Sequence, residues 1–214
     1  MQITDIVNFW RGEQTADEDS HWAHRLDRPL LDAQPHGFNL DFPINPYVGN
    51  VLTARVIILS SNAGYDPVLT AAEFPDVAKF AASLFRTDNP ELADWSLVSP
   101  YYNRTNYGRF IASGQAVLIN ASPYRSPMLT DEPANQLLLP ILPTSVFVRR
   151  WLLKAVLPMA ATSERLVVLK RGRRWWQLPG LDTLPGVIVE PNERFPSLGK
   201  ARIAAIEEFL ANQL

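Results

Sequence analysis

The chain contains 214 residues, 47% hydrophobic and 20% charged, with a formal net charge of −2. This composition excludes a disordered or strongly basic chain, so nucleic acid would have to bind through a local basic patch. The absence of cysteine excludes disulfides, cysteine-ligated metal sites and cysteine nucleophiles, and the lack of any run of about 18 apolar residues argues against a membrane partner.

Residues 1–42 are expected to form a helical lead-in to the first strand. A short helix is predicted at 3–11 and a more polar one at 16–31. His21 and His24 would share one face of the second helix, where a metal could bind. No third ligand has a convincing spacing, so we favour a solvated helix face.

Four short apolar segments predict strands that are buried on both faces of a sheet. They span residues 56–60, 115–121, 165–170 and 187–190. The connections between them are long enough to cross over, which favours parallel pairing with right-handed crossovers. We therefore predict one α/β domain over residues 1–214, with a central four-stranded parallel sheet and helices on both faces.

The connections also contain helical patterns. One helix is predicted at 73–86 and another at 144–161, where Thr144 or Ser145 can cap the N-terminus. A C-terminal helix is predicted at 197–214 because its apolar residues follow helical spacing.

Two segments are predicted to be irregular. The first is 42–50, which contains prolines and a glycine, and the second runs from the end of the 73–86 helix to Asn106. Irregular passages of that length are often functional. Aromatic residues in the second segment could stack on a base, although core packing is at least as good an explanation for each.

Polar loops follow three of the predicted strands. The first strand runs into small and polar residues that include Asn62 and Gly64, and Asp66 with its following proline can open a turn or helix. The second strand ends at Asn120, followed by the loop SPYRSP, and the fourth is followed by PNERFPS. Ligands bind outside the carboxyl ends of parallel strands, so these loops predict one shared site.

These strand ends resemble motifs of the uracil-DNA glycosylase superfamily, in the style of its single-strand-selective monofunctional branch. The first motif of that branch, Gly-Met-Asn-Pro-Gly, corresponds to residues 60–64, SSNAG. The family's second strand ends in an asparagine that reads the base, which corresponds to Asn120. Its last motif, His-Pro-Ser-Pro-Arg-Asn-Pro, corresponds to residues 190–196, EPNERFP. The resemblance covers residues 43 to 200 and implies a uracil-DNA glycosylase-like fold.

The resemblance implies a DNA base glycosylase, which hydrolyses the N-glycosidic bond of a damaged or modified base flipped into a pocket. Asn62 would orient the attacking water, and Asn120 would read the Watson–Crick edge of the base. Glu190 replaces the family's histidine, which stabilises the leaving base, and Ala63 replaces the first-motif proline. Glu190 would help only if it were protonated, or if Arg194 supplied the positive charge instead.

The expected site therefore has three groups of residues. Catalytic roles are expected for Asn62, Glu190 and Arg194. Contacts to the substrate are expected from Gly64, Tyr65, Asn120, Tyr124 and Asn192. Contacts to phosphate are expected from Arg125, Arg171, Arg173 and Arg174. The last three run into Trp175 and Trp176, which would stack on a base or, in the alternative, pack in the core beneath a basic turn.

We expect a monomeric protein that acts on DNA without a cofactor or a metal. Its N-terminal sequence lacks the regions of a signal peptide, so we expect it in the cytoplasm. The missing histidine leaves a second hypothesis open, a catalytically silent module of the same fold that binds a nucleotide, a nucleic acid or a protein. The two asparagines at separate strand ends favour an enzyme, or at least a base pocket. Serine-hydrolase and dinucleotide-binding motifs are absent, and the glutamates do not have Nudix spacing.

Overall fold

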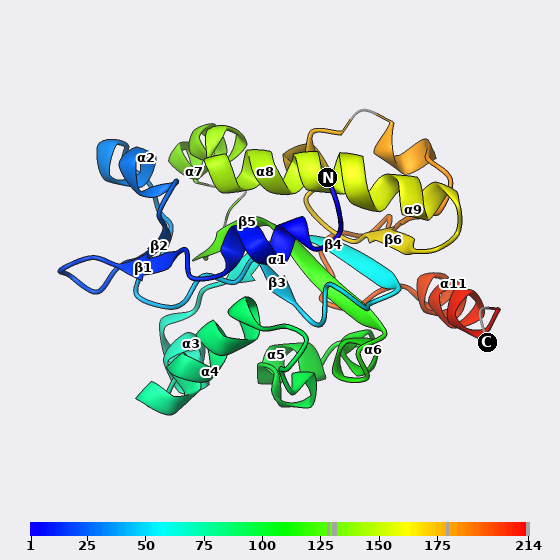
Figure 1. Cartoon of the computed structure of the whole chain (residues 1–214), viewed down its shortest axis with the longest axis horizontal. Coiled ribbons are helices and arrows are strands. Elements are labelled where there is room, and N and C mark those ends of the chain that lie inside the picture. Colours follow the sequence, from blue (N-terminus) through cyan, green and yellow to red (C-terminus); the bar gives the residue numbers. More distant parts are fainter. Residues whose placement is uncertain (128, 130–131, 179, 213–214) are drawn as a thin grey trace.

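The computed structural model describes residues 1–127, 129, 132–178 and 180–212, and it has an α/β fold around a mixed sheet (Figure 1). Five strands lie in the order β3-β5-β4-β6-β7. Their bounds are Tyr47–Val48 for β3, Val56–Gly64 for β4, Ala116–Ser126 for β5, Leu166–Leu169 for β6 and Val187–Val189 for β7. The predicted α/β class is confirmed.

The prediction of a purely parallel, four-stranded sheet is wrong in one respect. The four expected strands pair in parallel, but β3 adds a fifth strand antiparallel to β5. Tyr47 and Val48 lie in the segment that was expected to be irregular, and two residues are too few to show an alternating pattern. By pairing with β5, they satisfy backbone groups that would otherwise form an open sheet edge.

Helices pack on both faces of the sheet (Figure 1). One face is covered by α1 (Asp5–Trp10), α8 (Pro143–Trp151) and α9 (Leu157–Ala161), with a π-helical segment, Leu152–Val156, joining α8 to α9. The other face is covered by α5 (Pro100–Asn103), α6 (Gly108–Ala112), α11 (Lys200–Ala211) and the 3-10 turn Trp95–Leu97. The remaining helices are α2 (Arg28–Ala33), α3 (Pro67–Glu73), α4 (Val77–Asp88), α7 (Pro133–Leu138) and α10 (Arg173–Trp176), with 3-10 turns at Leu139–Ile141 and Leu181–Thr183.

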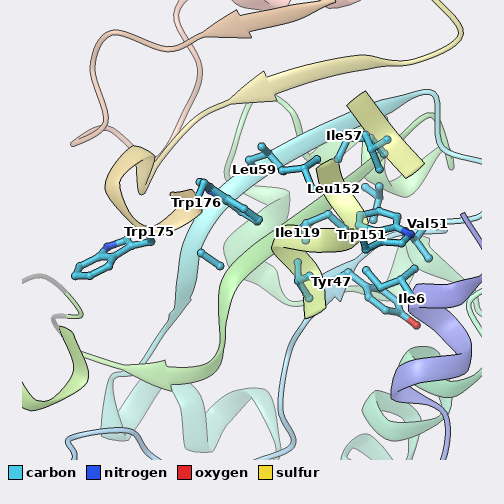
Figure 2. Packing of buried hydrophobic residues seen from close by; sticks show 14 of the residues in the cluster. Ile6, Tyr47, Val51, Ile57, Leu59, Ile119, Trp151, Leu152, Trp175 and Trp176 are labelled. Carbon is cyan, nitrogen blue, oxygen red and sulfur yellow. The ribbon is translucent and has the colours of Figure 1, made fainter. Parts of the chain in front are cut away.

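Alternate side chains of the central strands enter two separate cores, as expected for strands buried on both faces. Ile57 and Leu59 pack with Trp151 and Trp176 on the α8 face, where Figure 2 shows them in one cluster. Ile58 belongs to the cluster on the opposite face. This alternation also decides which face each polar residue at a strand end occupies.

The predicted helix at 16–31 is not formed. The chain instead makes an antiparallel hairpin of β1 (Gln14–Ala16) and β2 (Trp22–His24), followed by α2. The Asp17 carboxylate accepts hydrogen bonds from the backbone amides of Asp19 and His21. Such side-chain to backbone bonds compete with a helix and stabilise a turn. The lead-in is therefore only partly helical.

The segment predicted as one helix at 73–86 belongs to two. The carboxylate of Asp66 caps α3 by accepting from the amides of Val68 and Leu69, and that of Asp76 caps α4 by accepting from Lys79. Part of the segment predicted to be irregular forms α5. In the described part of the chain, no helix combines the length and apolar character needed to cross a membrane.

The helix predicted at 144–161 is present, but its predicted cap is wrong. Leu142 occupies the N-cap position, and the Asp27 carboxylate accepts hydrogen bonds from the amide and hydroxyl of Thr144. Ser145 instead donates its hydroxyl to the carbonyl oxygen of Ala121. The C-terminal helix begins at Lys200 rather than at 197, and residues 213 and 214 of the prediction lie outside the described residues.

Candidate functional site

An open pocket of about 850 Å³ lies where β4 ends, beside the loops that follow β6 and β7. Its walls contain many of the basic residues singled out in the sequence. The lining residues are Ser61, Asn62, Pro127, Leu129, Arg171, Gly172, Arg173, Arg174, Trp175, Glu193 and Arg194. The predicted residues that meet here are Asn62, Arg171, Arg173, Arg174 and Arg194. The pocket is therefore rich in positive charge, with one asparagine at the end of a central strand.

Asn62 has a fixed orientation in the pocket wall. Its Nδ2 donates hydrogen bonds to the carbonyl oxygens of Ala63 and Ser126, at 2.9 and 3.2 Å, and to the Ser126 hydroxyl at 3.0 Å. Its Oδ1 accepts from the Ser61 hydroxyl at 3.2 Å. A carboxamide oxygen has two lone pairs, so Oδ1 retains the capacity to accept one more hydrogen bond, for example from water.

The turn after β6 brings its arginines against β4 because Gly172 is small. Gly172 has a φ of +75°, and a Cβ added there would lie 3.1 Å from both the Cα and the Cβ of Ser61. Any larger residue would push the turn away from the strand and suffer backbone strain. Gly172 therefore sets the distance between the arginine-bearing turn and the segment that carries Asn62.

The four pocket arginines have different surroundings. Arg171 donates to the carbonyl oxygen of Arg194 at 2.9 Å, and its buried Nε has no hydrogen-bond partner among the described residues. Arg173 forms an ion pair with Asp182. The Arg174 guanidinium lies 4.1 Å from the ring centre of Trp175. Arg194 is exposed. The pocket thus presents several guanidinium groups suited to phosphate.

The two tryptophans after these arginines differ in position. Trp176 is fully buried beside Leu59, whereas Trp175 lies at the edge of the cluster and lines the pocket (Figure 2). For Trp176, the alternative of core packing is correct. Trp175 is mostly buried as well, so only part of its surface faces the pocket.

Glu193 is a pocket residue that was not singled out from the sequence, although the loop that carries it was expected at the site. Its Oε2 accepts a hydrogen bond from the Gly172 amide at 2.9 Å, so the loop after β7 is joined to the turn after β6. The available signal was its place in the loop that follows the last strand, next to Arg194. Ser61 and Gly172 were missed in the same way, because their role depends on the close approach of two loops.

Glu190, expected to be catalytic, does not line the pocket. It is buried, and its Oε2 and Oε1 accept hydrogen bonds from the amides of Gly199 and Asn192, at 2.7 and 3.2 Å. Gly199 is the N-cap residue of α11, so the carboxylate also lies at the positive end of that helix. Through these two hydrogen bonds, Glu190 holds together the two ends of the loop between β7 and α11.

Asn120 also lies outside the pocket, in a buried polar row across the ends of the parallel strands. The pairing register places Asn120 beside Ser60, and Lys170 and Glu190 follow the paired residues Leu169 and Val189. Asn120 donates its Nδ2 to the carbonyl oxygen of Asn45 at 2.7 Å, while its Oδ1 has no partner among the described residues. Its side chain is buried and is not among those that line the pocket.

Lys170 is the most unusual member of this row, because a lysine is seldom fully buried without an ion pair. It is 1% exposed, its Nζ donates to the carbonyl oxygen of Phe195 at 3.2 Å, and it lies 5.6 Å from the ring centre of Tyr107. Burial, with a smaller contribution from the charge of nearby Arg171, lowers the pKa of Lys170 to about 7, although Glu190 and Glu193 oppose the shift. Lys170 thus titrates near neutral pH.

The stability of the protein is expected to rise with pH from about 7 to about 10.5, the ordinary pKa of lysine. In that range the unfolded chain keeps the Lys170 proton and the folded chain has lost it, so raising the pH favours the folded state. We expect Lys170→Met to flatten this rise in urea unfolding measured across the same range. Lys154→Met, which changes an exposed lysine, should leave the rise intact. Equal slopes in all three proteins would contradict the assignment.

Tyr124 and Arg125 do not line this pocket, although both were expected at the site. The SPYRSP segment is part of β5 rather than a loop. Tyr124 is fully buried and donates its hydroxyl to Asp27 Oδ2 at 2.7 Å. Arg125 is buried, forms an ion pair with Glu73 at 3.3 Å and lies over the ring of Phe74. This part of β5 is held by pairing with β4 at Ser122 and Ser126 and by a bridge from Arg125 to Asn39, so the side chains lie in the interior.

The remaining predicted residues, Gly64, Tyr65 and Asn192, do not line the pocket. Gly64 ends β4 and is exposed, and the Tyr65 amide donates to the carbonyl oxygen of Ser126 at 3.2 Å. Asn192 is exposed and its Oδ1 accepts from the Arg194 amide at 3.3 Å. Asn192 therefore shapes the loop that carries Arg194.

Both ring nitrogens of His24 form hydrogen bonds with backbone groups of the protein. Nε2 lies 3.1 Å from the carbonyl oxygen of Phe9, and Nδ1 accepts from the Leu26 amide at 3.1 Å. Burial lowers the pKa of His24, which favours its neutral form. Across the described ranges, no group of three or more histidine, aspartate and glutamate side chains is arranged to hold a metal ion.

Comparison with family models, with curated proteins and with solved structures found no match to this chain.

Proposed function

We propose that the pocket binds a strand of DNA, and that the protein hydrolyses the N-glycosidic bond of a damaged or modified base held there. One observation carries the proposal: Asn62, at the end of a central strand, shares a pocket with Arg171, Arg173, Arg174 and Arg194. Guanidinium groups bind phosphate and a strand-end carboxamide can orient water, so the pocket holds two functions that a glycosylase needs.

The pocket suits the charge changes of glycosidic cleavage. A departing base develops negative charge, which a positively charged group beside it stabilises. Arg194 is exposed within the pocket wall, and it is our candidate for this role in place of the family's histidine. Asn62 Oδ1 would hold the attacking water. The proposal does not use Glu190 or Asn120, because both are buried outside the pocket.

A second candidate function is a silent module that binds nucleic acid without cleaving it. The amide of Asn62 already donates to three acceptors within the protein, and the carboxylate of Glu190 accepts from two backbone amides. Each of these residues therefore has a structural role that does not require catalysis. This candidate predicts binding of oligonucleotides with no release of any base.

The test uses labelled oligonucleotides that carry uracil, hydroxymethyluracil, hypoxanthine or a modified cytosine, in single and double strands. Alkali then converts each abasic site into a strand break. We expect at least one substrate to be cleaved, and Asn62→Ala to slow base release at least tenfold while binding persists, because water loses its orienting group. Asn103→Ala, which changes an exposed asparagine of α5, is the matched control.

Binding of the same oligonucleotide by Asn62→Ala shows that the variant is folded. Binding by the unchanged protein with no break on any substrate would favour the silent module. Absence of both binding and cleavage would rule out both candidates for this pocket.

A further inference from the structure

We infer that Glu193 is the carboxylate that accepts the proton of the attacking water. This inference rests on the proposed glycosidic cleavage and adds a catalytic residue to it. Glu193 lines the pocket together with Asn62, whereas Glu190, the residue at the position of the family's histidine, does not. The assignment thus moves the catalytic carboxylate three positions along the same loop.

The position of Glu193 is fixed on one side only. Its Oε2 accepts from the Gly172 amide at 2.9 Å, and this is its one side-chain hydrogen bond among the residues the structure describes. Gly172 in turn lies against Ser61, the neighbour of Asn62. The carboxylate is therefore held close to the segment that bears Asn62, and Oε1 remains open to water.

A carboxylate is the group that the pocket otherwise lacks. The amide of Asn62 can orient water, but it is too weak a base to take a proton, and arginine stays protonated. Cleavage of a glycosidic bond passes through a state with positive charge on the sugar, which a carboxylate stabilises directly. Glu193 can serve both purposes, while the surrounding guanidinium groups bind phosphate and the departing base.

The reaction is balanced with water as the only co-reactant. A lone pair of the water oxygen forms a bond to C1′ of the sugar, and one water proton passes to a carboxylate oxygen of Glu193. The N-glycosidic bond breaks, and its electron pair leaves with the base. The base then takes up a proton from solvent, and Glu193 releases its proton to solvent. The products are an abasic site and the free base.

Glu193→Gln is the most informative variant because glutamine keeps an oxygen that can accept from the Gly172 amide. It removes a negative charge from a pocket that binds phosphate, so affinity for the oligonucleotide should stay equal or increase. Single-turnover base release should slow more than tenfold, because the proton acceptor is lost. If Glu193 had only a structural role, its replacement would be expected to weaken binding and slow base release together.

Glu208→Gln makes the same change in charge at an exposed site on α11 and should leave both quantities unchanged. The substrate is whichever of the four modified oligonucleotides the unchanged protein cleaves, and binding is measured on the matched strand with a non-hydrolysable sugar analogue. If Glu193→Gln cleaved at the rate of the unchanged protein, the role assigned to Glu193 would be wrong, while the proposed function would stand. Absence of cleavage by the unchanged protein would overturn the proposed function, and this inference with it.

Discussion

Replacement of Asp27 by alanine is expected to lower the free energy of unfolding by on the order of 4 kcal/mol. The Asp27 carboxylate accepts from the Thr144 amide at 3.0 Å, from the Thr144 hydroxyl, and from the Tyr124 hydroxyl at 2.7 Å. All three residues are buried. Alanine would leave these donors without a partner in the interior, which costs more than the net worth of the bonds themselves.

The replacement of Asp27 is also expected to weaken the contacts of two elements of the fold, α8 and β5. Helix α8 has no side-chain cap of its own, so Asp27 supplies the acceptor that its first turn needs. Tyr124 belongs to β5, so the same carboxylate joins the N-terminal segment to the sheet. Loosening this contact should therefore destabilise the helix and its packing on the strand together.

Urea unfolding followed by circular dichroism would measure the change. Asp27→Asn keeps an oxygen acceptor and should lose much less stability, whereas Asp32→Ala, on the exposed side of α2, should behave like the unchanged protein. Burial raises the pKa of Asp27, although bonds from Thr144 and Tyr124 oppose the shift. A raised pKa means that its contribution to stability falls as pH rises through that value, and Asp27→Asn should lack this dependence.

An Asp27→Ala protein with the same urea midpoint as the unchanged protein would show that water or a local shift satisfies the three donors. The capping role assigned to Asp27 would then be wrong.

The double variant Arg173→Ala/Arg194→Ala is expected to bind a single-stranded oligonucleotide roughly 100-fold more weakly, about tenfold for each lost phosphate contact. Both arginines line the pocket and are exposed, so their loss should change binding more than folding. The ion pair between Arg173 and Asp182 lies at the surface and contributes little to stability.

Fluorescence anisotropy of a labelled oligonucleotide at several salt concentrations would measure the effect. If both residues contact phosphate, the slope of log affinity against log salt should fall by about 1.4 for a single strand. Arg104→Ala/Arg150→Ala removes the same charge from exposed positions outside the pocket. Equal weakening by the two double variants would mean that net charge, rather than this pocket, attracts the strand.

The strands could be predicted from the sequence because short runs of β-branched and aliphatic residues are typical of strands that are buried on both faces of a sheet. The segments at Val56, Ala116, Leu166 and Val187 all became parallel strands of one sheet. The polar residues after the predicted strands at 56–60 and 165–170 allowed Asn62 and the arginines after Lys170 to be named as a candidate site. The predicted end of the first strand is wrong, however, because β4 continues to Gly64 and includes Asn62. These features depend on near neighbours in the chain.

The hairpin at residues 14–24 and the extension of β5 could not be predicted in the same way. The hairpin depends on the turn that Asp17 stabilises, whose polar residues also suit a helix surface. The extension of β5 depends on pairing with β4, which turns the apparent SPYRSP loop into buried strand. The hydrogen bonds that hold the end of β5 against β4 join distant segments and form only after the chain has folded back on itself.

The class of the fold, and the strand ends that carry polar residues, follow from the sequence alone. The tertiary structure determines which of these side chains enter the pocket, because successive residues of a strand face opposite sides of the sheet and the pocket forms where distant loops meet. It turned Glu190 toward the start of α11 and brought Glu193 against Gly172. It also joined Asp27 to Thr144, 117 residues away, a contact with no local signature.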